Sequence, residues 1–212
     1  LVKAYAAEYP ELHEEMQKWF AGFTPDLEND EDFWTFADKK DATRNTSGIV
    51  LIAKNRYAAD RFAKTNPELH YQKLYTALCL GEVPPSGEIQ GYIRRLGDSI
   101  ITRAAFESGK ESEFAHTRFT RMETVGNISV VRCEPITGRT HQLRVHLASI
   151  GHPIVGDDLY GGGFALPRQA LHAGILAFDH PFTKEHIELH APLPRDMADF
   201  LAKIKKGTAN ES

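Results

Sequence analysis

The chain has 212 residues, a formal net charge of −4, and 42% hydrophobic and 25% charged residues. These values are close to those of an average globular domain, so they exclude a largely disordered chain, a collagen and a coiled coil. No apolar run approaches eighteen residues, so the sequence predicts no membrane-spanning helix. Two cysteines are too few for a disulfide framework or a thiolate zinc site. We therefore expect Cys79 and Cys133 to be small core residues in a reducing compartment.

The acidic side chains are concentrated at the start of the chain. Residues 1–42 hold eleven acidic and four basic side chains, whereas the remainder holds eighteen acidic and twenty-one basic ones. An acidic surface repels nucleic acid and a mildly basic one tolerates it, so the two parts favour different partners. A solvated acidic helix is the simpler interpretation of the same charges.

The hydrophobic pattern predicts four elements in the first part of the chain. Apolar residues at helical spacing predict a helix over 10–22. A short apolar run predicts a strand over 48–53, and the asparagine that follows it is a suitable cap for a helix over 55–64. Alternating residues predict a further strand over 71–81.

The second part of the chain predicts two hairpins and two helices. In chain order these are strands 115–124 and 128–134 joined at Gly126-Asn127, a helix over 139–150, strands 171–178 and 186–190, and a last helix over 195–205. Strands in hairpin order with interspersed helices predict the α+β class with a mainly antiparallel sheet. Residues 207–212 are expected to form a flexible tail.

The densest polar stretch lies around the start of the predicted helix 139–150. A Thr-Gly turn leads into a helix whose first turns carry Arg139 and Arg144, and such an N-terminus suits a phosphate or a carboxylate. On a helix that begins at residue 139, Arg139 would share one side with Gln142 and His146. The alternative is a surface helix with ordinary ion pairs.

The histidines of this stretch do not form a convincing metal site. His141 and His146 are five positions apart, and this spacing does not align two ligands on one helix face. His152 follows the helix, and no acidic residue completes the set. We therefore expect no metal here.

Five segments have the order and composition of a known set of motifs. They are NTSGIVLIAK (45–54), KLYTALCLGEVP (73–84), Ala115-His116-Thr117, PITGRTHQLRVHLASIGHPIVGDDLYG (135–161), and LHAGILAFDHP through APLP (171–194). Over about residues 43–200 the chain resembles the RluA-type pseudouridine synthases, and the fourth segment is the most specific of the five.

This resemblance implies a fold and a reaction. The fold is an α+β pseudouridine synthase fold, with a mixed, mostly antiparallel sheet, flanking helices and a central RNA cleft. In the reaction a uridine is flipped from RNA into the cleft, its C1′–N1 bond is broken, and C5 is rejoined to C1′. One carboxylate carries this chemistry, and no metal or organic cofactor is implied. The resulting divisions are an acidic, divergent N-terminal segment (1–42), a pseudouridine synthase-like domain (43–206) and the tail (207–212).

The resemblance also implies roles for individual residues. Tyr75 matches the tyrosine that stacks on the base, and Arg144 matches the arginine that pairs with the catalytic carboxylate. The structural alternative for Tyr75 is an aromatic residue of the core, and the alternative for Arg144 is an ion pair on the surface. Further substrate-binding residues by the same match are Arg44, Arg139, His141 and Gln142.

The chain departs from the family pattern at the catalytic position. Aligned on the Thr-Ser-Gly of the first motif, the family's aspartate falls on Thr43 and its preceding arginine on Asp41. A threonine hydroxyl is neutral and is a poor nucleophile without an adjacent base. Loss of the only catalytic carboxylate would cost many powers of ten in rate. Thr43 also leaves Arg144 without that family partner, and three outcomes are open. Another acid reaches Arg144, which would favour the active synthase, or the cleft is open to water, or an RNA phosphate supplies the charge, and these last two favour a binding protein.

Asp41 is the alternative catalytic residue. On an extended segment it faces the same way as Thr43, but its Cα is displaced by roughly 6–7 Å. Catalytic geometry tolerates about 1 Å, so a local bulge would have to close the gap.

The sequence thus favours a catalytically inactive, pseudouridine-synthase-like protein that binds RNA in ribosome assembly. Its partners would be rRNA, on the cleft side, and proteins of an assembly intermediate, on residues 1–42, which we expect to lie outside the sheet. One alternative is an active synthase that isomerises uridine in rRNA or tRNA through Asp41. A protein-interaction scaffold without RNA is the other. The expected location is the mitochondrial matrix or the cytosol.

Overall fold

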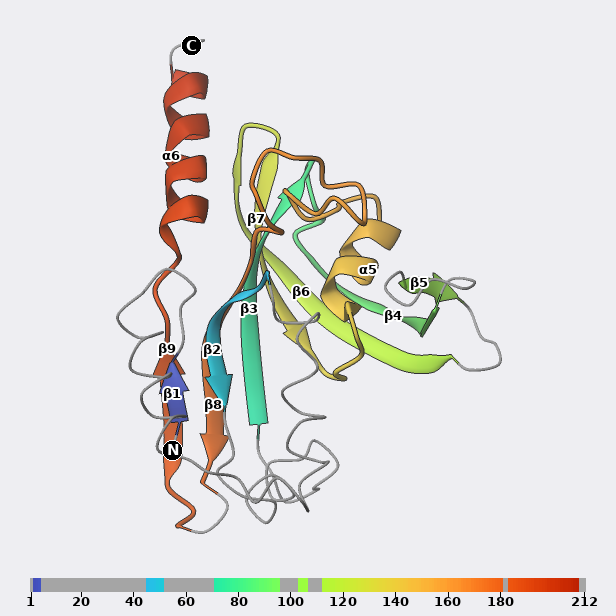
Figure 1. Ribbon diagram of the computed structural model, residues 1–212, viewed down its shortest axis with the longest axis vertical. Helices are drawn as coiled ribbons and strands as arrows, with labels where there is room; N and C mark the ends of the chain where they lie inside the picture. Colours follow the sequence, from blue (N-terminus) through green and yellow to red (C-terminus); the bar gives the residue numbers. More distant parts are fainter. Residues whose placement is uncertain are drawn as a thin grey trace, which may run out of the picture. The chain divides into compact units, whose positions relative to one another are not determined.

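The computed structural model forms two compact units (Figure 1). One unit combines Leu1–Lys73 with Ala173–Pro194, and the other combines Leu74–His172 with Arg195–Ser212. The residues that the structure describes are 2–4, 45–51, 71–95, 103–106, 112–180 and 183–209. The predicted helices 10–22 and 55–64 lie outside this set.

The first unit is built on four strands. They are β1 (Val2–Ala4), β2 (Ser47–Leu51), most of β8 (Leu171–Asp179), and β9 (His186–His190). The order is β1–β2–β8, and β9 pairs antiparallel with β8. The predicted strands of this unit are therefore confirmed. Because β1 pairs antiparallel with β2, the expectation that residues 1–42 lie outside the sheet is wrong for Val2–Ala4.

A small core fixes β2 against β8. Ile49 packs with Leu176 and Phe178, and each of the three is at most 1% exposed. Gly48 makes this approach possible, because a Cβ there would lie 2.2 Å from the Ala173 carbonyl oxygen. Its φ of 114° is also one that side-chain-bearing residues rarely adopt. A glycine is thus required where the first motif reads Thr-Ser-Gly.

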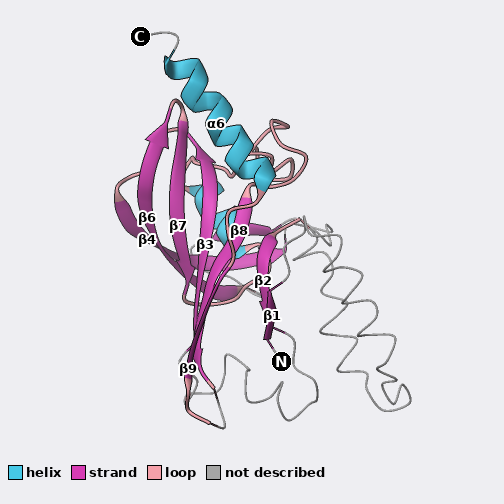
Figure 2. Cartoon of the chain, turned by 90° about the vertical axis from the view of Figure 1, so that its left-hand side faces the viewer, coloured by secondary structure: helices cyan, strands magenta, loops and turns pink. Residues whose placement is uncertain are grey.

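The second unit is a twisted antiparallel sheet with two helices (Figure 2). Its elements are β3 (Tyr71–Leu80, from Leu74 on), β4 (Ser86–Arg95), β5 (Arg103–Phe106), β6 (Glu113–Val125), β7 (Ile128–Pro135), α5 (Gln142–Ser149) and α6 (Arg195–Ala209). The order is β3–β7–β6–β4–β5, and each neighbouring pair is antiparallel. The α+β class with a mostly antiparallel sheet is confirmed.

The helix α5 packs on the sheet of this unit. Val145 lies in a core cluster with Ile93 and Ala115, and Tyr160 packs against it. Leu143 and Leu147 are also buried, as the spacing predicted. Cys79 and Cys133 are both buried and free, so the prediction that they are core residues is confirmed. None of the helices in the described part of the chain is long and apolar enough to cross a membrane.

Two helix boundaries differ from the prediction, and two strands, β4 and β5, were not predicted. The helix α5 begins at Gln142 rather than 139, because His141 adopts a left-handed conformation (φ 57°) just before it. At the other end of the chain, α6 continues to Ala209, so 207–209 are helical and do not belong to a tail. The strand β4 was not predicted, since its two glycines lower the strand propensity. One of them, Gly87, leaves the space that the Phe119 ring occupies.

Candidate functional site

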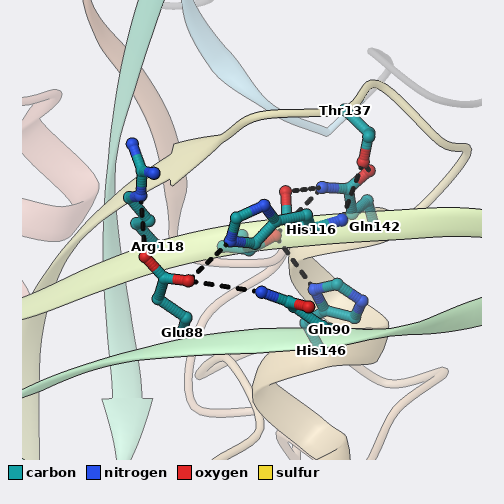
Figure 3. A network of polar contacts seen from close by, with 8 residues as sticks. Glu88, Gln90, His116, Arg118, Thr137, Gln142 and His146 are labelled. Atoms are coloured by element: carbon teal, nitrogen blue, oxygen red, sulfur yellow. Dashed lines mark hydrogen bonds and ion pairs between the residues drawn. The ribbon is translucent and has the colours of Figure 1, made fainter.

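Gln142 joins the polar loop to the sheet. Its side-chain oxygen accepts hydrogen bonds from the Thr137 hydroxyl (2.7 Å) and the Arg139 N–H (2.9 Å). Its amide nitrogen donates to the His116 carbonyl (2.9 Å) and to Thr117 Oγ1 (3.0 Å) (Figure 3). An amide has two donors and two acceptor positions, so these four bonds use its full capacity. The predicted contact of Gln142 with substrate would require one of them to break.

A second, exposed network lies on β4 and β6 (Figure 3). Glu88 receives hydrogen bonds from Arg118 Nε (2.8 Å) and from Gln90 (3.3 Å), and its carboxylate lies 3.0 Å from His116 Nε2. The hydrogen bond from Arg118 is the main cause that lowers the pKa of the Glu88 carboxyl, and this carboxyl therefore stays ionised. Both members of the Glu88–Arg118 pair are about half exposed, so this pair contributes little to stability.

His146 occupies a buried position behind this network. Its Nδ1 lies 2.9 Å from Thr117 Oγ1, and its Nε2 has no hydrogen-bond partner. His146 Nδ1 and the Thr117 hydroxyl share a hydrogen bond whose donor depends on the tautomer of the ring. Desolvation, and then the nearby His116, lower the pKa of His146 to about 4. The ring is therefore neutral at physiological pH.

The buried His146 predicts a specific sensitivity to acid. In the unfolded chain its pKa is near 6.5, so between pH 6.5 and 4 the unfolded state binds the additional proton. The free energy of unfolding includes the full contribution of the neutral His146 above pH 6.5. This contribution falls by up to about 3 kcal/mol as the pH drops to 4. Urea unfolding across this range should therefore show a smaller loss in His146→Gln than in the wild type. His190→Gln makes the same substitution on the strand β9 and is the control against which the His146→Gln slope is compared.

Arg144 forms a buried ion pair with Asp157. Its Nε and Nη2 donate to the two carboxylate oxygens of Asp157, each at 2.7 Å. Asp157 is fully buried, and the Arg144 side chain is 11% exposed. The guanidinium also lies over the Tyr160 ring, 4.9 Å from its centroid, and the Tyr160 hydroxyl lies 2.9 Å from His141 Nδ1. Of the three outcomes open for Arg144, the structure shows the first, in which another acid reaches it, and that acid is Asp157.

The Asp157 carboxylate holds Arg144 but is not placed to attack a substrate. One of its oxygens also accepts the Tyr160 N–H at 3.2 Å, and the side chain has no exposed surface. Arg144, in contrast, has five N–H donors, and only two of them bind Asp157. Its remaining donors have no partner among the described residues. The side chain is thus fixed by Asp157 through Nε and Nη2, and three of its five donors form no hydrogen bond with a described residue.

Arg139 lies apart from this ion pair. Its Nε donates to the Phe114 carbonyl at 3.0 Å, and its Nη1 pairs with Glu113 at the start of β6. Since α5 begins after it, Arg139 does not share a helix side with Gln142 and His146. These last two residues instead meet at Thr117.

Tyr75 lies on the sheet face that α5 covers. The register places Tyr75 opposite Cys133 and Cys133 opposite Phe119. Phe119 shares its face with Thr117, which contacts α5. Burial raises the pKa of the Tyr75 phenol well above its usual range, so the ring stays neutral. Its stacking role remains a prediction.

The other predicted site residues lie outside the described part of the chain. These are Thr43, Asp41 and Arg44. Within the described ranges, no group of three or more histidine, cysteine, aspartate or glutamate side chains is placed to hold a metal ion. Sequence reasoning missed Asp157, although it lies inside the quoted segment 135–161. The signal was available, because a buried arginine requires a carboxylate nearby.

Comparison with known proteins defines the class of this fold. The structure of the human RNA Pseudouridylate Synthase Domain Containing 1 aligns with a TM-score of 0.57 and 27% identity, over 76% of each chain. The sequence profile described as RNA pseudouridylate synthase matches residues 43–149. The chain belongs to the RluA-type RNA pseudouridine synthase family and has its fold.

Two curated relatives show the extent of the similarity. The Uncharacterized RNA pseudouridine synthase YjbO of Bacillus subtilis is 39% identical over 160 residues, which cover 74% of this chain and 56% of that protein. The Ribosomal large subunit pseudouridine synthase C of Vibrio cholerae is 35% identical over 173 residues, covering 77% and 53%. The chain thus spans about half the length of the curated relatives it matches.

Proposed function

We propose that this chain is an RNA-binding member of the family that has lost isomerase activity. The sequence feature that supports the proposal is Thr43, on which the family's catalytic position falls when the first motif is aligned on its Thr-Ser-Gly. A threonine there supplies no anionic oxygen for the step at C1′. We found no described carboxylate that is free to replace it at Arg144, since Asp157 is buried and bound through both oxygens.

The Arg144–Asp157 pair explains how binding would survive this loss. A buried guanidinium without a counter-ion is strongly unfavourable, so an arginine that depended on residue 43 would be destabilised by threonine. Here Asp157 supplies the counter-ion from the same unit. The remaining N–H donors of Arg144 stay available for an RNA phosphate or a ribose oxygen.

We propose rRNA as the RNA partner and ribosome assembly as the setting. Support comes from relatives named as ribosomal large subunit pseudouridine synthases in Vibrio species. The acidic residues 1–42 would contact protein in an assembly intermediate, since their charge disfavours RNA.

An active synthase that uses Asp41 is the second candidate. One observation favours it: two nitrogens of Arg144, Nη1 and Nη2, keep donors that could receive another carboxylate. In this case the site would work with a displaced acid, and the pair with Asp157 would remain as it is.

RNA binding is the first test of the proposal. We expect the wild-type chain to bind an rRNA fragment with unpaired uridines, with an affinity that falls steeply as salt rises. Arg139→Gln should reduce the slope of log K against log salt by about 1, because one phosphate contact is lost. Lys203→Gln, which removes one charge from α6, is the matched control.

Absence of binding to naked RNA at low salt would overturn the proposal. If the same preparation then bound ribosomal particles, the protein-interaction scaffold would be the better account.

A further inference from the structure

The loop from Gly156 to Arg168 is closed at its base by backbone contacts. Gly156 N–H donates to the Gly162 carbonyl (3.0 Å), and Gly162 N–H donates to the Asp157 carbonyl (2.7 Å). A Cβ at Gly162 would lie 1.7 Å from the Ile154 carbonyl oxygen, so no other residue fits there. At the far end, Arg168 forms an ion pair with Asp196 of α6 (2.8 Å). The loop is therefore held at both ends.

This loop exposes one aromatic ring. Phe164 is 88% exposed, far more than any other large hydrophobic side chain in the described part of the chain. Gly161 and Gly163, which both precede Phe164, have no neighbouring atoms within 4 Å of where a Cβ would lie. A single exposed apolar side chain is ordinary on a protein surface. Phe164, however, lies on the part of the loop beyond the backbone hydrogen bonds that close it at Gly162.

The fixed base connects Phe164 to Arg144. The backbone carbonyl of Asp157 accepts a hydrogen bond from the Gly162 N–H. The carboxylate of Asp157 accepts hydrogen bonds from Arg144. Tyr160, which lies against the guanidinium, belongs to the same loop. Phe164 follows Gly162 by two residues, at most about 7 Å of chain. Phe164 therefore belongs to the same loop as Asp157 and Tyr160, which both contact the Arg144 guanidinium. That guanidinium keeps three N–H donors that Asp157 does not use.

We propose that Phe164 is a stacking residue for an unpaired RNA base that flanks the nucleotide at Arg144. This inference rests on the proposed function. Exposed aromatic rings next to cationic groups bind single-stranded RNA, because every base offers a face for stacking. A phenyl ring has no hydrogen-bonding group, so Phe164 distinguishes unpaired from paired RNA and does not read sequence. A protein contact at the same ring is the competing outcome of the test.

The test compares Phe164 variants in binding to a single-stranded rRNA fragment and to its duplex form. Phe164→Ala should weaken single-strand binding by roughly 5- to 150-fold, with the melting temperature unchanged. Phe164→Trp should retain the affinity, and Phe164→Leu, which is apolar without a π face, should lose most of it. Duplex binding should be equal in all four proteins.

An RNA with one abasic position beside the bound uridine identifies the stacked base. It should bind the wild type as weakly as intact RNA binds Phe164→Ala, and the variant should lose nothing further. Equal single-strand affinity of Phe164→Ala and wild type overturns the inference while leaving the proposed function intact. Loss of binding only to ribosomal particles would also overturn it and would assign Phe164 to a protein contact. A wild type that binds no RNA overturns both.

Discussion

Asp157→Asn is expected to lower the free energy of unfolding by about 3–5 kcal/mol. The substitution removes the charge that neutralises Arg144 but leaves the guanidinium 11% exposed and in place. It also replaces one acceptor oxygen by an amide that cannot accept from the guanidinium. For a chain of this length the melting temperature should fall by roughly 10 °C, measured by circular dichroism or calorimetry.

Asp158→Asn provides the control for this variant. It makes the same change at the next residue, which is exposed. We expect its stability to stay within about 0.5 kcal/mol of the wild type. A double variant, Arg144→Met with Asp157→Leu, should recover much of the lost stability, because no charge then remains buried. Equal melting temperatures for Asp157→Asn and Asp158→Asn would show that the ion pair does not hold this part of the fold.

Thr43→Asp is expected to produce the largest change in activity. Aligned on the Thr-Ser-Gly of the first motif, the family's catalytic aspartate falls on this position, so the substitution restores the carboxylate that the resemblance implies. If the rest of the site is competent, pseudouridine formation should rise at least about a thousandfold over the wild type. The measurement is the amount of pseudouridine in rRNA after incubation with purified protein.

Thr43→Asn is the matched control, since it has nearly the same shape as aspartate but no charge. It should stay at the wild-type level. If Thr43→Asp also forms no product while it binds RNA normally, then a second change has disabled the site. Asp41, which occupies the position of the family's arginine, is the first residue to replace in that case.

Much of the fold was predictable, because the hydrophobic pattern and the turns agree along most of the chain. The hairpin β6–β7 and the pair β8–β9 follow from strand-type apolar segments that flank Gly126-Asn127 and His180-Pro181 in the sequence. The strand β4 was not predictable in this way. Its Gly87 leaves room for the ring of Phe119 on the neighbouring strand β6, where a Cβ would collide with that ring. Such a contact depends on strand pairing and leaves no local signal.

The site was predicted in part. The resemblance drew attention to Arg144 and to the loss of its family partner at position 43, but it did not identify which other acid reaches Arg144. The actual partner, Asp157, is thirteen positions away in the chain and follows a turn. The start of α5 was misplaced for a similar reason. His141 takes a left-handed conformation there, with its side chain beside the Tyr160 hydroxyl, and this contact is not visible in helical spacing.

The most direct test of the central claim is to count pseudouridine formed by the wild-type chain. Purified protein is incubated with rRNA lacking modifications, and the product is quantified beside Asp41→Asn and a sample without protein. The account predicts RNA binding with no product above background in either protein. Product formed by the wild type and lost in Asp41→Asn would contradict it and would make Asp41 the catalytic carboxylate.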